Sequence, residues 1–313
     1  MYQAGAGCYI GSQFVGALAY ADDVVITAPT ATAMRRLLAI CDNYARQYNM
    51  SFNASKSKWL AVVPRRRRVL YDRVDQCSFF VGGKRIDFVN SFVHLGHVIT
   101  AVQNDDDDIC KRRADFIGQV NNMTCTFNKL DPFTRYRLFR SYCSSFYGCE
   151  LWLLSNSHIE DLCASWRKSL RTVWRLPNRT HSFLLHLISD CLPLFDELCK
   201  RIINFAPYCL RHESNLVRFV TSHGVLYLRG SSILGQNVWF CMHRFKCRLS
   251  DVVNWPVTTL IHKFVDKSFD DSMRRSASFL IELLLLRDNT LSLCPAQLST
   301  SQLNQIIKYA CIS

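Results

Sequence analysis

The sequence lacks closely spaced cysteine pairs. Its 15 cysteines include no CxxC or CxxxC pair, and the shortest separations, Cys143 to Cys149 and Cys241 to Cys247, are six residues. A structural zinc site needs ligands close enough in sequence to close a small chelate loop, so this spacing speaks against a zinc finger or ribbon. We expect reduced thiols that fill the core, as is typical of cytosolic or nuclear proteins.

Long apolar runs are also missing. The longest run beyond the N-terminus, Phe279 to Leu286, is interrupted by Glu282 and is far shorter than a membrane span. The first 21 residues are mildly apolar, but they have no positively charged start and lead directly into Asp22, so they make a poor signal peptide. The sequence therefore predicts an intracellular protein, nuclear or cytoplasmic, that is not secreted and has no membrane partner.

Acidic residues are few relative to basic ones. The 313 residues contain 38 Lys and Arg against 25 Asp and Glu, a net charge of +13. A content of 49% hydrophobic and 12% aromatic residues indicates a folded core and argues against disorder or a low-complexity fibre. Such an excess of positive charge favours a phosphate-rich or otherwise acidic partner, although composition alone does not say which.

Residues 1 to about 100 have an α+β pattern. Two apolar runs, 14–20 and 24–27, are separated only by Ala21, Asp22 and Asp23 and predict a β-hairpin. Thr30 then suits a helix N-cap. The apolar stripe of this helix consists of Met34, Leu37, Leu38, Cys41, Ala45 and Tyr48. Further strands are predicted at 59–63, 77–81, 84–89 and 92–99, with a Gly82-Gly83 turn.

Beyond residue 100 the apolar residues follow helical spacing. Helices are predicted at 105–127, 132–150, 156–175 and 180–191, with a break at Pro193 and a continuation to about 205. The acidic run Asp105 to Asp108 suits a helix N-terminus, which explains it without a metal ion. The segment 221–237 is rich in Ser and Gly and is expected to be a loop.

Asp22 and Asp23 are adjacent acids at the tip of a hairpin whose strands are apolar enough to be buried. Two-metal phosphoryl transfer needs carboxylates of this kind, because Mg²⁺ prefers oxygen ligands. Asp also tolerates turn conformations, so ordinary turn chemistry explains the same pair. The pair alone leaves both interpretations open.

The order of the motifs adds a family resemblance. The segment GCYIGSQFVGALAYADDVVITAPT, then FNASKSK at 52–58, then FVHLGHVIT at 92–100 closely resemble the reverse transcriptase of non-LTR (LINE-type) retrotransposons, from just before the motif C hairpin onward. The resemblance implies catalytic, metal-binding roles for Asp22 and Asp23. It also implies a place near the primer terminus for Tyr20, contact with the triphosphate for Lys56 or Lys58, and a primer grip that includes Leu95 and Gly96.

The resemblance continues to about residue 245. The segment FNKLDPFTRYRLFRSYCSSFYGCELW resembles the thumb side of these enzymes, and later segments resemble the helical region after it. The implied fold is α+β: a partial palm with motifs C, D and E at 1–100, thumb-like helices at 101–155, and a helical C-terminal region at 156–313. The partners implied for the complete enzyme are an RNA template, a DNA primer, dNTP and Mg²⁺.

The sequence departs from the family in what precedes motif C. The motif A aspartate, motif B, the fingers and an upstream endonuclease are not found before the hairpin. Two carboxylates do not fix two Mg²⁺ ions about 4 Å apart. We therefore expect an N-terminal portion to be missing, Mg²⁺ binding to be weak or absent, and the isolated chain not to polymerise.

Basic residues cluster in two regions that are candidates for nucleic-acid contact. The first holds Lys56, Lys58, Arg73 and the run Arg65, Arg66, Arg67 and Arg68, which also suits a nuclear import signal. The second includes Arg112 and Arg113, with Tyr136, Phe139, Tyr142, Trp166 and Trp174 interleaved among later arginines. Aromatic residues can stack on bases, but at helical spacing they more often face the core.

Three interpretations of function remain. The first is a fragment of an RNA-directed DNA polymerase that uses two-metal nucleotidyl transfer in its parent. The second is a non-catalytic remnant that binds RNA or an RNA/DNA hybrid, and the third is a translation product without a maintained role.

His94 and His97 flank a strand turn, where packing or surface roles are expected rather than metal binding.

Overall fold

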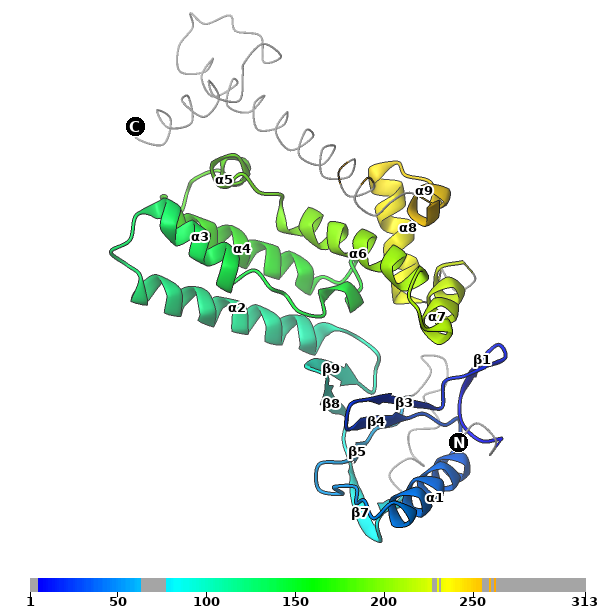
Figure 1. Ribbon diagram of the computed structural model, residues 1–313. Helices are drawn as coiled ribbons and strands as arrows, with labels where there is room; N and C mark the ends of the chain where they lie inside the picture. Colours follow the sequence, from blue (N-terminus) through cyan, green and yellow to red (C-terminus); the bar gives the residue numbers. More distant parts are fainter. Residues whose placement is uncertain are drawn as a thin grey trace, which may run out of the picture. The chain divides into compact units, whose positions relative to one another are not determined.

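The computed structural model describes residues 5–62, 77–226, 230, 232–254, 259 and 262. Its secondary structure is mixed, with small sheets followed by helices, so the predicted α+β class is confirmed (Figure 1). The chain divides into two compact units, 1–107 and 108–313. The first boundary lies near the one expected at residue 100, whereas the boundary expected at residue 155 falls inside the second unit.

The first unit begins with two small hairpins. Strands β1 (Tyr9–Ile10) and β2 (Gln13–Phe14) pair antiparallel, and so do β3 (Ala17–Tyr20) and β4 (Asp23–Ile26). The β1–β2 pair was not predicted from the sequence, while β3–β4 is the predicted hairpin.

Helix α1 (Ala31–Gln47) begins where the sequence predicts. The Thr30 side chain accepts a hydrogen bond from the Ala33 backbone N–H, which satisfies one of the free donors of the first turn. Leu37, Leu38, Cys41 and Ala45 of the predicted stripe are buried. Tyr48 is not, because it caps the C-terminus and is 55% exposed.

A three-stranded sheet packs against α1. It consists of β5 (Lys58–Trp59), β7 (Lys84–Phe88) and β6 (Phe79–Val81), in that order, with β5 and β7 parallel. Gly82 and Gly83 form the predicted turn, and their φ angles of 58° and 73° suit glycine. Leu38 joins Ala54, Phe79, Val81 and Ile86 in the small core beneath.

The strand segment predicted at 92–99, with a turn flanked by His94 and His97, is a hairpin. Strands β8 (Ser91–His94) and β9 (His97–Thr100) pair antiparallel, with His94 opposite His97. Leu95 and Gly96 form the turn with φ angles of 48° and 80°. The glycine supplies one of the two left-handed residues that a type I′ turn needs, which splits the apolar run.

The second unit is helical. Its elements are α2 (Asp106–Thr126), α3 (Pro132–Tyr142), the 3₁₀ turn η3 (Cys149–Leu151), α4 (His158–Trp174), α5 (Ser182–Ser189), α6 (Leu194–Leu210), α7 (Asn215–Leu226), α8 (Ile233–Phe245) and α9 (Leu249–Asn254). Helices α2, α3 and α4 lie side by side, and α6 leads to the group formed by α7, α8 and α9 (Figure 1). Buried residues from Ile109 to Val252 belong to one core.

One helix prediction and one loop prediction are wrong. The helix expected at 132–150 ends at Tyr142, and the loop expected at 221–237 is mostly covered by α7 and α8. In the second case the small residues serve helix packing and capping. A Cβ on Gly224 would lie 2.9 Å from the Ser232 hydroxyl oxygen, and that hydroxyl accepts a hydrogen bond from the Gly235 N–H at the start of α8.

The described cysteines are all free thiols. Those that are buried are Cys41, Cys143, Cys149, Cys163, Cys199, Cys209 and Cys241. Burial raises the pKa of Cys149 and of Cys163 to about 12, so these thiols stay protonated and unreactive at neutral pH. The buried positions agree with the prediction of core-filling cysteines, whereas Cys110 and Cys125 of α2 are exposed.

Candidate functional site

The β3–β4 hairpin brings together the residues that the resemblance singles out. Tyr20 ends β3 and pairs with Asp23, the first residue of β4, so Ala21 and Asp22 alone form the turn. Ala21 has a φ of 51°, in the left-handed region. Asp22 and Asp23 are therefore consecutive carboxylates at the hairpin tip, and both are exposed.

The expectation that these strands are buried is wrong for the described residues. Neither β3 nor β4 contains a buried residue, and Leu18, Tyr20 and Val24 are 45%, 68% and 42% exposed. The cause lies in the pairing: β3 and β4 form a two-stranded sheet in which no further described strand covers an edge. Of their apolar residues, Ile26 at the end of β4 is partly buried and packs against the small core of the first unit.

The hairpin acids are of the type that binds Mg²⁺, but they are too few to form a two-ion site. Carboxylate oxygens are the ligands that Mg²⁺ prefers, and Asp22 and Asp23 supply them at one tip. Within the residues that the structure describes, no group of three or more His, Cys, Asp or Glu is arranged to hold a metal ion. Two adjacent carboxylates do not make a complete two-ion site.

The loop that resembles motif D is organised by Asn53. Its side-chain oxygen accepts hydrogen bonds from the Ser55 and Lys56 backbone N–H groups at 3.1 and 3.2 Å. Lys56 follows this turn and is exposed, whereas the ammonium of Lys58 lies 2.6 Å from a carboxylate oxygen of Asp87. That ion pair lowers the pKa of Asp87. Of the two candidate lysines, Lys56 is thus the one better placed to meet a phosphate.

The β8–β9 turn holds the predicted primer-grip residues. Leu95 is 41% exposed although it is apolar, and its left-handed conformation is uncommon for a branched side chain. His94 and His97 flank the turn as a cross-strand pair and are partly buried. Strain of this kind is often retained at binding sites, which makes the turn a reasonable candidate for contact with a ligand.

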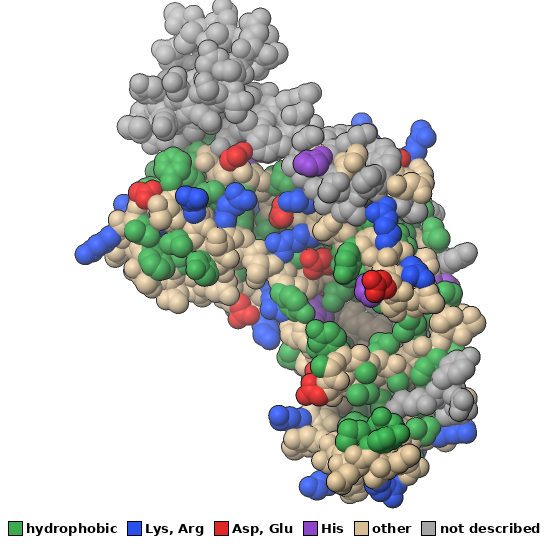
Figure 2. All heavy atoms as spheres, in the orientation of Figure 1, with side chains coloured by type: hydrophobic (Ala, Val, Ile, Leu, Met, Phe, Trp, Pro, Cys, Tyr) green, Lys and Arg blue, Asp and Glu red, His purple; other side chains and the backbone are tan. Residues whose placement is uncertain are grey.

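Most of the first basic cluster cannot be placed. Arg65, Arg66, Arg67, Arg68 and Arg73 lie outside the described residues. On the face drawn in Figure 2, the Lys and Arg side chains are spread over the surface, with apolar side chains and carboxylates between them. The view therefore does not identify a single basic patch.

In the second unit, the interleaved aromatic residues mostly face the core. Tyr136, Phe139, Trp166 and Trp174 are buried, which confirms the core interpretation for them, while Tyr142 is 70% exposed.

Several arginines of this unit hold the fold together. Arg113 donates to the Ser165 hydroxyl at 2.9 Å, and Arg135 is buried and donates to the Thr172 carbonyl at 3.2 Å. Arg112 differs, since its guanidinium carbon lies 5.6 Å from the centre of the Tyr147 ring. The two neighbouring arginines thus make different contacts, one with a serine hydroxyl and the other with an aromatic ring.

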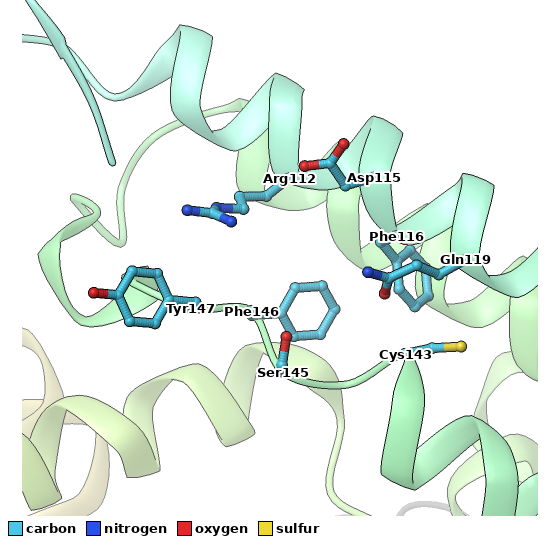
Figure 3. A pocket seen from close by; sticks show the side chains of 8 residues that line it. All are labelled: Arg112, Asp115, Phe116, Gln119, Cys143, Ser145, Phe146 and Tyr147. Carbon is cyan, nitrogen blue, oxygen red and sulfur yellow. The ribbon is translucent and has the colours of Figure 1, made fainter. Parts of the chain in front are cut away.

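Sequence reasoning missed the surface around Tyr147. This tyrosine follows α3 in a loop that the sequence analysis assigned to a helix, and it is 60% exposed. With Arg112 and Asp115 of α2 it lines a small pocket (Figure 3). The signal in the sequence was Gly148, because a glycine often interrupts or ends a helix. In the structure Gly148 has a φ of 81°, which a continuous helix does not allow.

Scanned against models of protein families, the chain matches none of them, and a search of curated proteins finds no match. Among the helices that the structure describes, none has both the length and the apolar character needed to cross a membrane.

Proposed function

We propose that the chain is the motif C to thumb portion of a non-LTR retrotransposon reverse transcriptase, an RNA-directed DNA polymerase. The observation that carries this proposal is the β3–β4 hairpin, in which Asp22 occupies a two-residue turn and Asp23 begins the next strand beside Tyr20. The tight hairpin presents two consecutive carboxylates at an exposed tip. The sequence resemblance supplies the chemistry that such a tip performs.

The order and exposure of the later motifs support the same proposal. Lys56 projects from an ordered turn after α1, and Leu95 and Gly96 form the tip of a separate hairpin. These positions suit contact with a phosphate and with a primer strand, respectively. The helical unit that follows contains the segment whose sequence resembles the thumb side of these enzymes.

A photocrosslinking experiment tests this function directly. The full chain would be mixed with an RNA template annealed to a DNA primer whose 3′-terminal nucleotide is photoreactive, and the crosslinked peptides identified by mass spectrometry. We expect crosslinks in 17–26 and 91–100, and a severalfold loss of the first in a Tyr20→Ala variant. Crosslinks confined to the second unit would overturn the polymerase proposal and favour a nucleic-acid-binding remnant; no crosslinks would overturn both.

Primer extension addresses catalysis separately. Because Asp22 and Asp23 alone do not complete a two-ion site, we expect the chain by itself not to extend a primed RNA template with dNTP and Mg²⁺. Extension that disappears in an Asp22→Asn/Asp23→Asn double variant would show that this chain is active on its own. The double variant is the matched control because the hairpin keeps its size and loses only its charge.

A further inference from the structure

The pocket between α2 and the loop after α3 combines three kinds of side chain that together suit one class of ligand. Arg112, Asp115 and Gln119 lie along one face of α2, and Ser145, Phe146 and Tyr147 lie across from them (Figure 3). Spacings of three and four residues place the α2 side chains on the same helix face. The pocket lies wholly within the second unit, so it does not depend on the β3–β4 hairpin.

The loop that carries Tyr147 is held in place by its neighbours. Phe146 is buried against Phe116 and Trp166, with ring centres 5.3 and 5.9 Å apart. Arg201 of α6 donates hydrogen bonds to the Ser144 carbonyl at 2.8 Å and to the Ser145 carbonyl. The backbone is thereby fixed immediately before Tyr147, so the exposed ring is positioned without further ordering on binding.

The loop is also strained. Phe146 has a φ of 38°, a conformation that is rare for a bulky residue, and Gly148 has a φ of 81°. This conformation turns the Phe146 ring inward and leaves its neighbour Tyr147 60% exposed. A large aromatic ring kept outside at the cost of backbone strain indicates a surface that is retained for contact.

The charges decide what the ring would contact. Arg112 lies against Tyr147, with 5.6 Å between its guanidinium carbon and the ring centre, and it brings a cation suited to a phosphate. Asp115 is an exposed carboxylate one turn away, which disfavours a second anion and favours N–H donors. A nucleotide offers all three partners: a planar base, a phosphate and, in guanine, adjacent N–H groups on the base edge that match one carboxylate.

We propose that this pocket binds an unpaired guanine nucleotide, with the base stacked on Tyr147, its edge donating to Asp115 and its phosphate near Arg112. The inference rests on the proposed function only in taking nucleic acid as the partner. The nucleotide chemistry is shared by a free guanosine phosphate and by a single-stranded RNA. The test separates these two sources.

Fluorescence anisotropy on the full chain tests the proposal. The probes are a labelled oligouridylate, the same strand with one guanosine at its centre, and free GMP as competitor. We expect the guanosine strand to bind about tenfold more tightly than oligouridylate, because base stacking and edge recognition add to phosphate contacts. Tyr147→Ala is expected to lower the affinity about tenfold, and Tyr147→Phe to restore most of it.

Two further variants make the test specific. Asp115→Asn is expected to abolish the preference for guanosine while oligouridylate binding stays the same or rises. Tyr208→Ala on α6 is the matched control, because Tyr208 is 64% exposed and is not among the residues that line the pocket. Competition by GMP at concentrations near the strand affinity would assign the pocket to the free nucleotide, and absence of competition would assign it to the strand.

Failure of this inference is distinguishable from failure of the proposed function. If both strands bind equally and Tyr147→Ala behaves as wild type, the pocket proposal is overturned, while crosslinks to the hairpins can still support the polymerase proposal. If Tyr208→Ala weakens binding as much as Tyr147→Ala does, general surface contact explains the data and the pocket proposal is again overturned.

Discussion

At the residue scale, a few buried polar side chains fix the second unit. Asn237 of α8 is 1% exposed; its side-chain oxygen accepts from the Leu154 N–H at 2.9 Å, and its amide donates to the Trp152 carbonyl at 2.7 Å. The Trp152 indole in turn donates to the buried carboxylate of Asp108 at 2.7 Å. The segment 152–154 is therefore held by side chains from both α2 and α8.

We predict that Asn237→Ala lowers the free energy of unfolding of the second unit by about 3 kcal/mol, because it leaves two buried backbone groups without partners. Tryptophan fluorescence during denaturant unfolding measures this. Asn204→Ala on α6 is the control, since Asn204 is exposed and its loss is expected to change little. Equal stability of the two variants would show that water replaces the Asn237 bonds.

The two lysines of the motif D-like loop allow a matched comparison. We predict that Lys56→Ala weakens binding to a primed RNA template and reduces the dependence of log affinity on log salt by about one. Lys58→Ala is expected to have a smaller effect, because the Lys58 ammonium is already paired with Asp87 at 2.6 Å. Binding titrations at several salt concentrations measure both slopes, and a larger effect of Lys58→Ala would reverse the assignment.

At the element scale, the β8–β9 turn retains an unfavourable residue. Leu95 adopts a φ of 48° where Asn or Gly is preferred. We predict that Leu95→Asn stabilises the first unit by about 1 kcal/mol, since Asn tolerates the left-handed region. Leu95→Ala keeps the unfavourable conformation and serves as the control in thermal unfolding. A stability gain from the alanine variant instead would locate the cost in the exposed leucine side chain.

Elements with strong local signals could be predicted from the sequence, and elements decided by distant contacts could not. Thr30 was predictable as an N-cap and Gly82-Gly83 as a turn, because these residue types favour those conformations on their own. In contrast, Gly224 lies in a helix because α7 packs closely against the start of α8, which no local pattern reveals.

The candidate site divides in the same way. The hairpin that presents Asp22 and Asp23 was predictable because a short polar gap separated two apolar runs. The exposure of its strands was not, because burial depends on which strands lie beside them. The Tyr147 pocket was missed because it arises from a loop conformation and from residues of α2 that are distant in sequence.

At the scale of the whole molecule, the two units have separate cores of different size. Among the described residues, the main apolar cluster of the first unit consists of Leu38, Ala54, Phe79, Val81 and Ile86, whereas that of the second extends over helices from Ile109 to Val252. Stability increases with the apolar area that a unit buries, so we expect the first unit to unfold at lower denaturant concentration. Trp59, which packs against the smaller core, makes it possible to follow that transition by comparison with a Trp59→Phe variant.

The buried His186 should make the second unit sensitive to acid. Burial lowers the pKa of His186 to about 4 from an ordinary value of 6.5, with Asp196 opposing the shift and Arg167 adding to it. Its Nδ1 is buried without a hydrogen-bond partner among the described residues, and Asp196 is itself paired with Arg244 at 2.8 Å. Between pH 6.5 and 4 the unfolded chain therefore binds a proton that the folded chain does not, so stability falls as the pH falls through this window.

From pH 7 to pH 5 we predict a loss of about 2 kcal/mol in the free energy of unfolding of the second unit. Denaturant unfolding at a series of pH values measures the loss. His186→Gln should remove most of this pH dependence, whereas His243→Gln, at an exposed position on α8, should leave it unchanged. An unaltered pH dependence in His186→Gln would assign the acid sensitivity to other groups.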